Sequence, residues 1–569
     1  MQEIPYKKTR ENDLFGRSAE IRSFLRTTPS NRATVSQFLH DVELELANYH
    51  AEINRLKTAI YAIETKRDRL KRAAERYKSL LSPIHTVPTE ILTTIFTFAC
   101  EQNELSRDVI PNVLRVSMVC GRWRDIVFST PRLWASIEID FGGWTTNFHV
   151  LKQLLQLFME RSKASSLRLS LALPGDGYSG GRAGREEVSS ILRVIVGQCE
   201  RWEDVTLDVV PQHFPSSIFD PIRGRLPLLT SLRIRHLDGS VQRWNHPFKY
   251  FEICPALHTL RIFPDLFDSQ NQNSSLPWTQ IQTLHLLTSY NVHAFPLLPL
   301  CTAVEHLELS AVGGPDKDNN DYSSHVVNSG VKTLSIMAAE AQSDVDGVLK
   351  HTTLGGLSSL GICSQSTDLT DEWPMWDSTC LEAFLQRSSC SITSLHLNAL
   401  PITDMQILAL LRLIPTITSL CIEEFCYRKE NRIVTAPFLD GLNTSVDSVP
   451  LVPKLTHFKV RVHAHNLASD AFLKALSSRW LPDPRHAMEI GVECLRFVTI
   501  VAIVSSDQGQ KDGHLDCLSC FKDAGMRFAL TYWTFPELYH DEDYEDEEED
   551  GQEEEEEEGE GDGNEDAAE

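Results

Sequence analysis

The organisation of this chain is decided by residues 80–134, LLSPIHTVPTEILTTIFTFACEQNELSRDVIPNVLRVSMVCGRWRDIVFSTPRLW. Their first part predicts a short amphipathic helix beginning near Pro88, where apolar residues recur at three- and four-residue steps: Ile91, Leu92, Ile95 and Phe96. A second helix is predicted over 113–127, with one apolar stripe made of Val116, Val119, Trp123 and Ile126. So few short helices cannot bury both of their faces, so we expect apolar surface left over for a partner.

The order of the short motifs in this stretch resembles the F-box of proteins abundant in mushroom-forming fungi. These motifs are VPTEIL at 87–92, Ile95-Phe96, VSMVCGRWR at 116–124 and TPRLW at 130–134. The family usually has Leu where this chain has Val87, which keeps an apolar side chain. The resemblance implies docking on the adaptor Skp1 of a cullin-based ubiquitin ligase, through Val87, Pro88, Ile91, Leu92, Ile95, Phe96, Val116, Val119 and Trp123. The spacing of the apolar residues alone is equally consistent with an alternative, in which these helices cap the following domain and bind no adaptor.

Upstream, residues 34–81 carry a heptad pattern that no Pro or Gly interrupts. Its steps of three and four residues run through Leu39, Val42, Leu46, Tyr49, Ile53, Leu56, Ile60, Ile63, Arg67, Leu70, Ala74, Tyr77 and Leu81. This pattern predicts a coiled coil, with Arg67 as the one polar residue of the seam. The seam requires a partner helix, which is a second copy of the chain, another part of the same chain or an unseen element.

Downstream of residue 134 a repeat governs the chain. Its unit is an apolar residue, two spacers and Leu-x-apolar, as in Leu229-Thr-Ser-Leu232-Arg-Ile234. The central residues of nine copies stand at 232, 260, 284, 307, 334, 360, 395, 420 and 458, at steps of 28, 24, 23, 27, 26, 35, 25 and 38. Most steps fall in the window of about 20–29 residues that is typical of leucine-rich repeats. Stacked copies predict an irregular solenoid with a curved parallel sheet, closed by a strand–helix–strand cap at 492–533.

In such a sheet, the side chains between the buried positions point to the concave surface. Among them we expect five residues to contact a polypeptide ligand: Arg233, Arg261, His285, Glu308 and His396. The alternative is that they form the solvated face of any soluble parallel sheet. Arg233 and Arg261 on adjacent copies also raise the hypothesis of a phosphorylated ligand.

The charge of the chain is concentrated at its C-terminus. The net charge is −25, and residues 541–569 hold 20 acidic and no basic side chains, which leaves −5 for the rest. The nearly neutral body gives no support to nucleic-acid binding. The tail is predicted to be disordered, either as a solubilising segment or as an arm for basic partners such as histones.

Cysteine usage and hydropathy predict a cytoplasmic and/or nuclear protein with no membrane partner. The 13 cysteines show no regular framework, the N-terminus lacks an apolar leader, and the apolar run 497–504 is too short to cross a bilayer.

Motifs of catalysis or cofactor binding are weak. No Ser-His-Asp order, nucleophile elbow or HExxH helix occurs, and the Gly-rich segment 174–184, expected to be an exposed loop, lacks the spacing of a phosphate-binding loop. Cys517 and Cys520, with His514, have the spacing of only half a zinc site. We therefore expect no catalytic residues, no cofactor and no metal.

Together these patterns predict an α+β chain in five parts: a flexible N-terminus (1–33), a coiled coil (34–81), an F-box (82–134), an irregular leucine-rich-repeat solenoid with a C-terminal cap (135–535) and a disordered acidic tail (536–569). The expected function is non-catalytic substrate recognition in a ubiquitin ligase built on Skp1 and a cullin. The alternative is a coiled-coil scaffold outside any ligase, whose acidic tail binds basic partners.

Overall fold

The computed structural model describes residues 32–175, 178–209, 216–236, 247–262, 276–288, 295–311, 325–338, 342–364, 377–426, 431–444, 449–505 and 513–535. Nearly all of the predicted flexible N-terminus (1–33) and the whole predicted acidic tail (536–569) lie outside these residues. The chain divides into two compact units, Met1–Ile95 and Phe96–Glu569, which are described separately.

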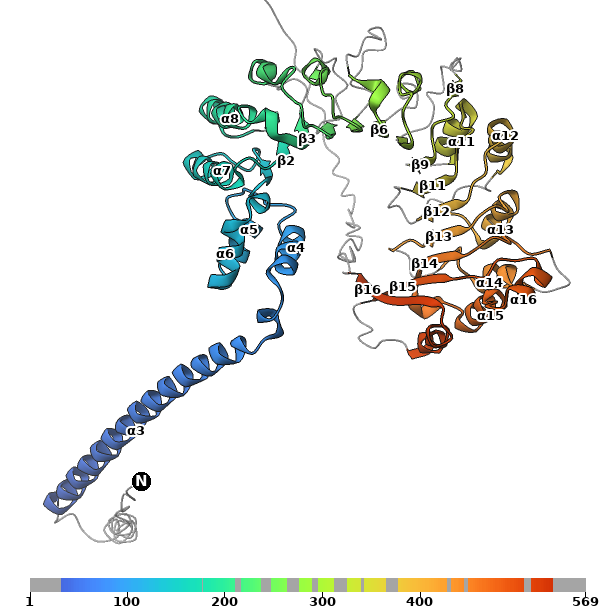
Figure 1. Cartoon of the computed structure of the whole chain (residues 1–569). Coiled ribbons are helices and arrows are strands. Elements are labelled where there is room, and N and C mark those ends of the chain that lie inside the picture. The colour runs from blue at the N-terminus through green and yellow to red at the C-terminus, as the bar shows by residue number, and fades with distance from the viewer. Residues whose placement is uncertain are drawn as a thin grey trace, which may run out of the picture. The chain divides into compact units, whose positions relative to one another are not determined.

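The first unit is dominated by one helix, α3 (Arg32–Leu80), of 49 residues (Figure 1). At 1.5 Å per residue it is about 74 Å long. The heptad residues along it are largely exposed, as at Leu46 (51%), Ile53 (47%) and Leu70 (73%). The predicted long helix is present, and its pairing with another helix stays a prediction.

A short 3-10 turn, η1 (Pro83–His85), follows α3, and α4 (Thr89–Ala99) comes next. At the start of α4 the Leu92 N–H donates to the Pro88 carbonyl at 3.1 Å.

The second unit begins with α5 (Asn112–Ser117), α6 (Gly121–Ser129) and the 3-10 turn η2 (Pro131–Trp134). The single helix predicted over 113–127 is therefore wrong: the chain breaks at 118–120, where Cys120 is extended (φ −159°). The carbonyl of Ser117 at the end of α5 accepts from Arg124 Nε at 3.3 Å, which gives this helix end a side-chain partner. Gly121, a poor helix former, stands at the start of α6.

Fourteen parallel strands then form one sheet in sequence order (Figure 1). They are β1 (Ser136–Asp140), β2 (Leu167–Ala172), β3 (Trp202–Val209), β4 (Ser231–His236), β5 (Thr259–Ile262), β6 (Thr283–Thr288), β7 (His306–Ala311), β9 (Thr333–Ala338), β11 (Ser359–Ser364), β12 (Ser394–Asn398), β13 (Ser419–Glu423), β14 (His457–His463), β15 (Phe497–Ser505) and β16 (Arg527–Phe535). A separate parallel pair joins β8 (Val326–Val327) to β10 (Thr352–Thr353).

The register of this sheet follows the repeated leucine. Leu232 pairs with Leu260, Leu260 with Leu284, and the series continues to Leu420 with Phe458. These residues are at most 3% exposed, so successive copies bury one continuous column. The predicted parallel sheet and its strand positions are confirmed, whereas the assignment to the leucine-rich-repeat type stays a prediction.

Helices cover the outer side of the sheet, and the strands line its inner, concave side (Figure 1). These helices are α7 (Phe148–Ser162), α8 (Gly181–Val196), α9 (Ser216–Phe219), α11 (Gln342–His351), α12 (Thr379–Ser388), α13 (Asp404–Leu413), α14 (Ala436–Leu442), α15 (Ser469–Arg479), α16 (Pro484–Ile490) and α17 (Cys520–Asp523). Between β4 and β7 the described connections contain 3-10 turns instead: η6 (Pro247–Phe251), η8 (Trp278–Gln280) and η9 (Leu298–Leu300). None of the helices in the described ranges is both long and apolar enough to span a membrane.

Two local predictions need correction. The Gly-rich segment is not a loop throughout, because α8 begins at Gly181. A Cβ at Gly180 or Gly184 would lie 2.4 or 2.6 Å from the Tyr178 side chain, so these glycines let the tyrosine lie against the helix. The predicted cap has the expected strand–helix–strand order, but it extends the sheet: β16 is the last strand, and its outer edge pairs with no described strand.

Candidate functional site

Helix α4 carries two apolar stripes. Leu92 and Phe96, four residues apart, are buried, at 0% and 1% exposure. Ile91, Ile95 and Phe98 form the second stripe at i, i+4 and i+7, and they are 52%, 47% and 70% exposed. Helix α4 therefore presents one apolar stripe on its surface in addition to the stripe that it buries.

The turn between α5 and α6 exposes two more apolar side chains. Met118 and Val119 are each 61% exposed. Their turn is held by local hydrogen bonds, since the Ser117 hydroxyl donates to the Leu114 carbonyl at 2.7 Å and the Met118 N–H donates to the same carbonyl at 3.1 Å. The break between the helices therefore leaves these side chains on the surface.

Aromatic side chains fix the helical part of the second unit to its first strands. The rings of Phe96 and Trp123 lie 4.7 Å apart, centroid to centroid. Trp134, at the end of the TPRLW motif, is fully buried and donates its indole N–H to the Val127 carbonyl at 2.9 Å. Its ring also lies edge-on to Phe158 of α7, with centroids 5.2 Å apart.

A buried amide joins the same elements. The Asn103 side-chain nitrogen lies 3.1, 3.0 and 3.1 Å from the carbonyl oxygens of Cys100, Leu133 and Ser136, and its oxygen accepts from the Val113 N–H at 2.9 Å. One fully buried side chain thus links the end of α4, the start of α5, η2 and β1.

The structure sorts the nine residues predicted to bind Skp1 into three groups. Pro88, Ile91, Ile95 and Val119 are exposed, Val87, Val116 and Trp123 are half-buried, and Leu92 and Phe96 are buried. Leu92 and Phe96 pack in the core of the described chain, and their contact with an adaptor stays a prediction. The other seven residues stay predicted contacts as well.

Sequence reasoning missed Phe98 and Met118 as exposed apolar residues of this region. The signal for Phe98 was present, because it extends the Ile91–Ile95 series by one further step of three. For Met118 no periodic signal existed, since its exposure follows from the break between α5 and α6.

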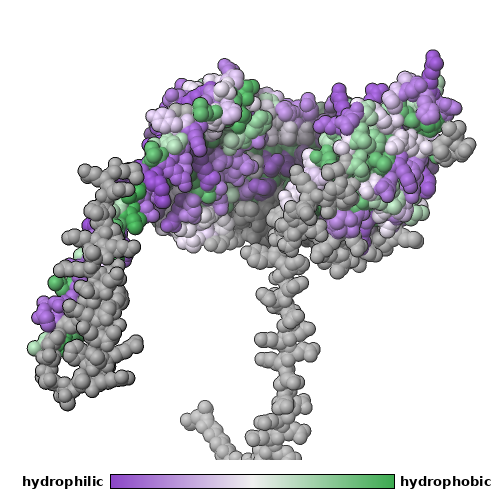
Figure 2. Space-filling view, turned by 90° about the horizontal axis from the view of Figure 1, so that it is seen from below, coloured by the Kyte–Doolittle hydropathy of each residue, from purple (hydrophilic) through white to green (hydrophobic). Residues whose placement is uncertain are grey.

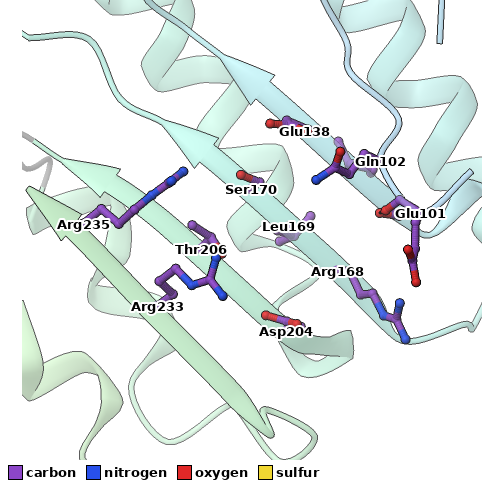
Figure 3. A pocket seen from close by; sticks show the side chains of 12 residues that line it. Glu101, Gln102, Glu138, Arg168, Leu169, Ser170, Asp204, Thr206, Arg233 and Arg235 are labelled. Atoms are coloured by element: carbon purple, nitrogen blue, oxygen red, sulfur yellow. The ribbon is translucent and has the colours of Figure 1, made fainter. Parts of the chain in front are cut away.

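A polar pocket of about 390 Å³ opens on the concave face of β1–β4 (Figure 3). Figure 2 looks into the hollow of this unit and shows mainly hydrophilic residues there. Side chains from the first four strands and from the segment before β1 line the pocket: Glu101, Gln102, Ser136, Glu138, Arg168, Ser170, Asp204, Thr206, Arg233 and Arg235, with Ile137 and Leu169. This pocket lies entirely within the second unit.

The three arginines of the pocket differ in their partners. Arg235 forms a bidentate pair with Asp208, at 2.6 and 2.7 Å. Arg168 and Arg233 form no hydrogen bond or ion pair with any side chain that the structure describes. Burial, and then the neighbouring Arg261, lowers the pKa of Arg233, so its cation is incompletely compensated. The pocket therefore offers two guanidinium groups to a carboxylate or phosphate.

Three other residues predicted to contact a ligand, Arg261, His285 and Glu308, interact with one another. Glu308 lies 2.9 Å from the Arg261 guanidinium and 2.6 Å from His285 Nδ1. The neighbouring His285 is the main reason that the pKa of Glu308 lies below its usual value, against the effect of burial. These residues form a cross-strand network over β5–β7.

His396, the fifth predicted contact, belongs to a second network. Its Nε2 lies 3.8 Å from Glu423, whose carboxylate also lies 2.8 Å from Lys459 Nζ and 3.0 Å from Arg461. The neighbouring Cys421 and then Glu423 raise the pKa of His396 to about 9, against the effect of burial. His396 first, and then Lys459 and Arg461, lower the pKa of Glu423, against the effect of burial.

Donor atoms of His396, Cys421 and Glu423 lie within 4.8 Å of one another, the one such group of three potential metal ligands among the described residues. An imidazole, a thiol and a carboxylate fit zinc chemically. Here, however, two cations already neutralise the carboxylate, and the imidazole favours its protonated form, which cannot coordinate. The arrangement fits a charge network better than a metal site.

Comparison with known proteins agrees with the geometry of the helical region. A family model described as F-box-like matches residues 84–140, which span α4, α5, α6, η2 and β1. A search of curated proteins gives no match to the chain. Residues 84–140 thus form an F-box-like domain.

Proposed function

Because residues 84–140 form an F-box-like domain, we propose that this chain is a substrate-recognition subunit of a ubiquitin ligase of the Skp1–cullin–F-box type. In this proposal the F-box-like domain docks on a Skp1-like adaptor, and the concave face of the sheet binds a protein substrate. The chain would act in the cytoplasm or nucleus without catalysing a reaction itself. Acceleration would come from holding the substrate near a ubiquitin-charged enzyme.

The observation that carries the proposal is the exposed stripe of α4. Three large apolar side chains, Ile91, Ile95 and Phe98, stand on its surface next to a buried stripe that already satisfies the packing of the helix. Exposed apolar groups in such a series are costly to leave in water and typical of an interface.

Co-purification tests the docking. Skp1 should be recovered with the full wild-type chain and lost on Ile91→Asp combined with Ile95→Asp. A matched control is Met488→Asp, which places the same charge at an apolar residue that is 82% exposed on α16, outside the domain. Equal recovery of Skp1 with the double variant, or none with the wild-type chain, would contradict the proposal. Circular dichroism checks that each variant is folded.

Substrate binding is proposed for the pocket on β1–β4. Its two guanidinium groups without a hydrogen-bonded side-chain partner among the described residues, on Arg168 and Arg233, favour an acidic or phosphorylated side chain of the substrate. The neighbouring carboxylates of Glu138 and Asp204 would accept hydrogen bonds from the substrate backbone or from a basic residue.

Self-association through α3 completes the proposal. The heptad residues of this helix are exposed along its length, and a seam of this kind is stabilised only when another helix covers it. A dimeric chain would bring two adaptor-docking domains into one assembly. Light scattering on the full chain tests this, with twice the monomer mass expected.

A further inference from the structure

The exposed seam of α3 has a second consequence, which concerns the direction of its partner. The seam is apolar from Leu39 to Ile63, polar at Arg67 and apolar again at Leu70. Figure 2 shows hydrophobic residues recurring among hydrophilic ones on the visible part of this helix. We propose that the occupant of the seam is α3 of a second copy running antiparallel, an inference that rests on the proposed self-association.

Arg67 decides against the parallel arrangement. In a parallel in-register pair, every seam residue faces its own copy, so two Arg67 side chains would meet between the helices. Burying two like charges together is strongly unfavourable. In the structure the Arg67 side chain is 66% exposed and bonded only to the adjacent Asp68, at 3.0 Å, so no described residue of another element neutralises it.

The antiparallel arrangement gives Arg67 a compatible neighbour. When the two-fold axis passes between Leu56 and Ile60, Arg67 faces Tyr49 of the second copy. A guanidinium group stacks favourably on a tyrosine ring, and its aliphatic stem packs in the seam while the charge reaches water. The apolar residues then face one another in the pairs Leu39–Tyr77, Leu46–Leu70, Ile53–Ile63 and Leu56–Ile60.

The charges that flank the seam favour the same direction. Acidic residues flank its N-terminal half, at Glu43, Glu45 and Glu52, and lysines flank its C-terminal half, at Lys66, Lys71 and Lys78. The antiparallel pair brings Glu43 to Lys71 and Glu52 to Lys66 of the second copy, leaving one like-charge contact between the two Lys57 side chains. The parallel pair keeps Glu52 near Lys57 but opposes Lys66 to Lys71, in addition to the Arg67 clash.

This direction sets the separation of the C-terminal ends of the two α3 helices. The C-terminal ends of the two α3 helices would point away from each other and lie about 66 Å apart, from 44 residues at 1.5 Å each. A parallel pair would place these ends side by side. The antiparallel dimer therefore separates the two points at which the chains leave the paired helices.

Disulfide trapping in the full chain tests the direction. Equal amounts of Leu46→Cys and Leu70→Cys chains are mixed, oxidised mildly and digested, and linked peptides are identified by mass spectrometry. We expect a 46–70 link and no 46–46 link, because the two 46 positions lie about 36 Å apart in the antiparallel pair. Tyr61→Cys, on the outer face of α3, is the matched control and should form no link between copies.

The possible failures are distinguishable. A monomeric mass for the wild-type chain overturns the self-association itself, whereas a dimer that forms the 46–46 link overturns only its direction. Adding Arg67→Ile to the Leu46→Cys chain should make the 46–46 link appear, because the substitution removes the charge that excludes the parallel pair. A continued lack of that link would overturn the orienting role of Arg67.

Discussion

The side-chain nitrogen of Asn103 lies 3.0 Å from the carbonyl oxygen of Leu133, thirty residues further along the chain. The same amide group reaches Cys100, Ser136 and Val113, and the side chain is fully buried. It therefore holds the helices of the F-box-like domain to the first strand of the sheet.

Asn103→Ala should lower the free energy of unfolding by about 3 kcal/mol, because it leaves several buried backbone groups without partners. Urea denaturation of the full chain, followed by circular dichroism, measures this loss. Asn48→Ala, at an exposed position of α3, is the matched control and should change stability little. A loss below about 0.5 kcal/mol for Asn103→Ala would show that water replaces these hydrogen bonds.

The two stripes of α4 should respond differently to substitution. Phe98→Asp should abolish recovery of Skp1 and leave the free energy of unfolding almost unchanged, because the side chain is 70% exposed. Phe96→Ala should cost about 3–5 kcal/mol, since it removes a buried ring packed on Trp123. Co-purification and urea denaturation of the same two chains give both readouts. Unfolding of the domain by Phe98→Asp would contradict the distinction between an exposed and a buried stripe on α4.

The pocket arginines give a test of substrate binding. Arg233→Ala should reduce the labelling of proteasome-stabilised proteins by a chain fused to a biotin ligase, because Arg233 is free to bind an anion. Arg235→Ala is the contrast, since Asp208 already occupies this guanidinium. Recovery of Skp1 should be unchanged in both. If the same proteins are labelled to the same extent with Arg233→Ala, the pocket has no part in the proposed substrate binding.

The network around His396 should make stability depend on pH. The pKa of His396 is raised to about 9, from an ordinary value of 6.5. Its contribution is therefore complete below pH 6.5 and is lost as the pH rises through about 9. Urea denaturation between pH 6 and 10 should show a decline for the wild-type chain that is smaller in His396→Gln. Parallel curves for the two chains would contradict the pairing of His396 with Cys421 and Glu423.

The parts of the fold that sequence predicted are those set by local periodicity. The repeated leucine fixed the strand positions because alternate residues of a strand must face the same core, and the heptads of α3 indicated a long uninterrupted helix. At the break before Gly121 the Arg124 side chain donates a hydrogen bond to the Ser117 carbonyl, and at Gly180 an added Cβ would meet the Tyr178 side chain. The spacing of apolar residues carries no information about either of these contacts.

The candidate sites were predictable only in part for a related reason. The column that contains Arg233, Arg261 and Glu308 follows from the strand period. Which member is free and which is paired depends on contacts between strands, as for Arg235 with Asp208, separated by 27 residues. Each such pairing requires the register and the direction of both side chains, which one sequence does not specify.

The outer edge of β16 offers backbone donors and acceptors that no described strand uses. An unpaired strand edge invites the corresponding edge of another molecule and so promotes fibrous aggregation. In the sequence, this strand is followed almost at once by a run with 20 acidic residues and no basic ones. Mutual repulsion between two such runs would keep the ends of neighbouring molecules apart, so we expect that shortening the run would cost solubility before it cost any binding partner.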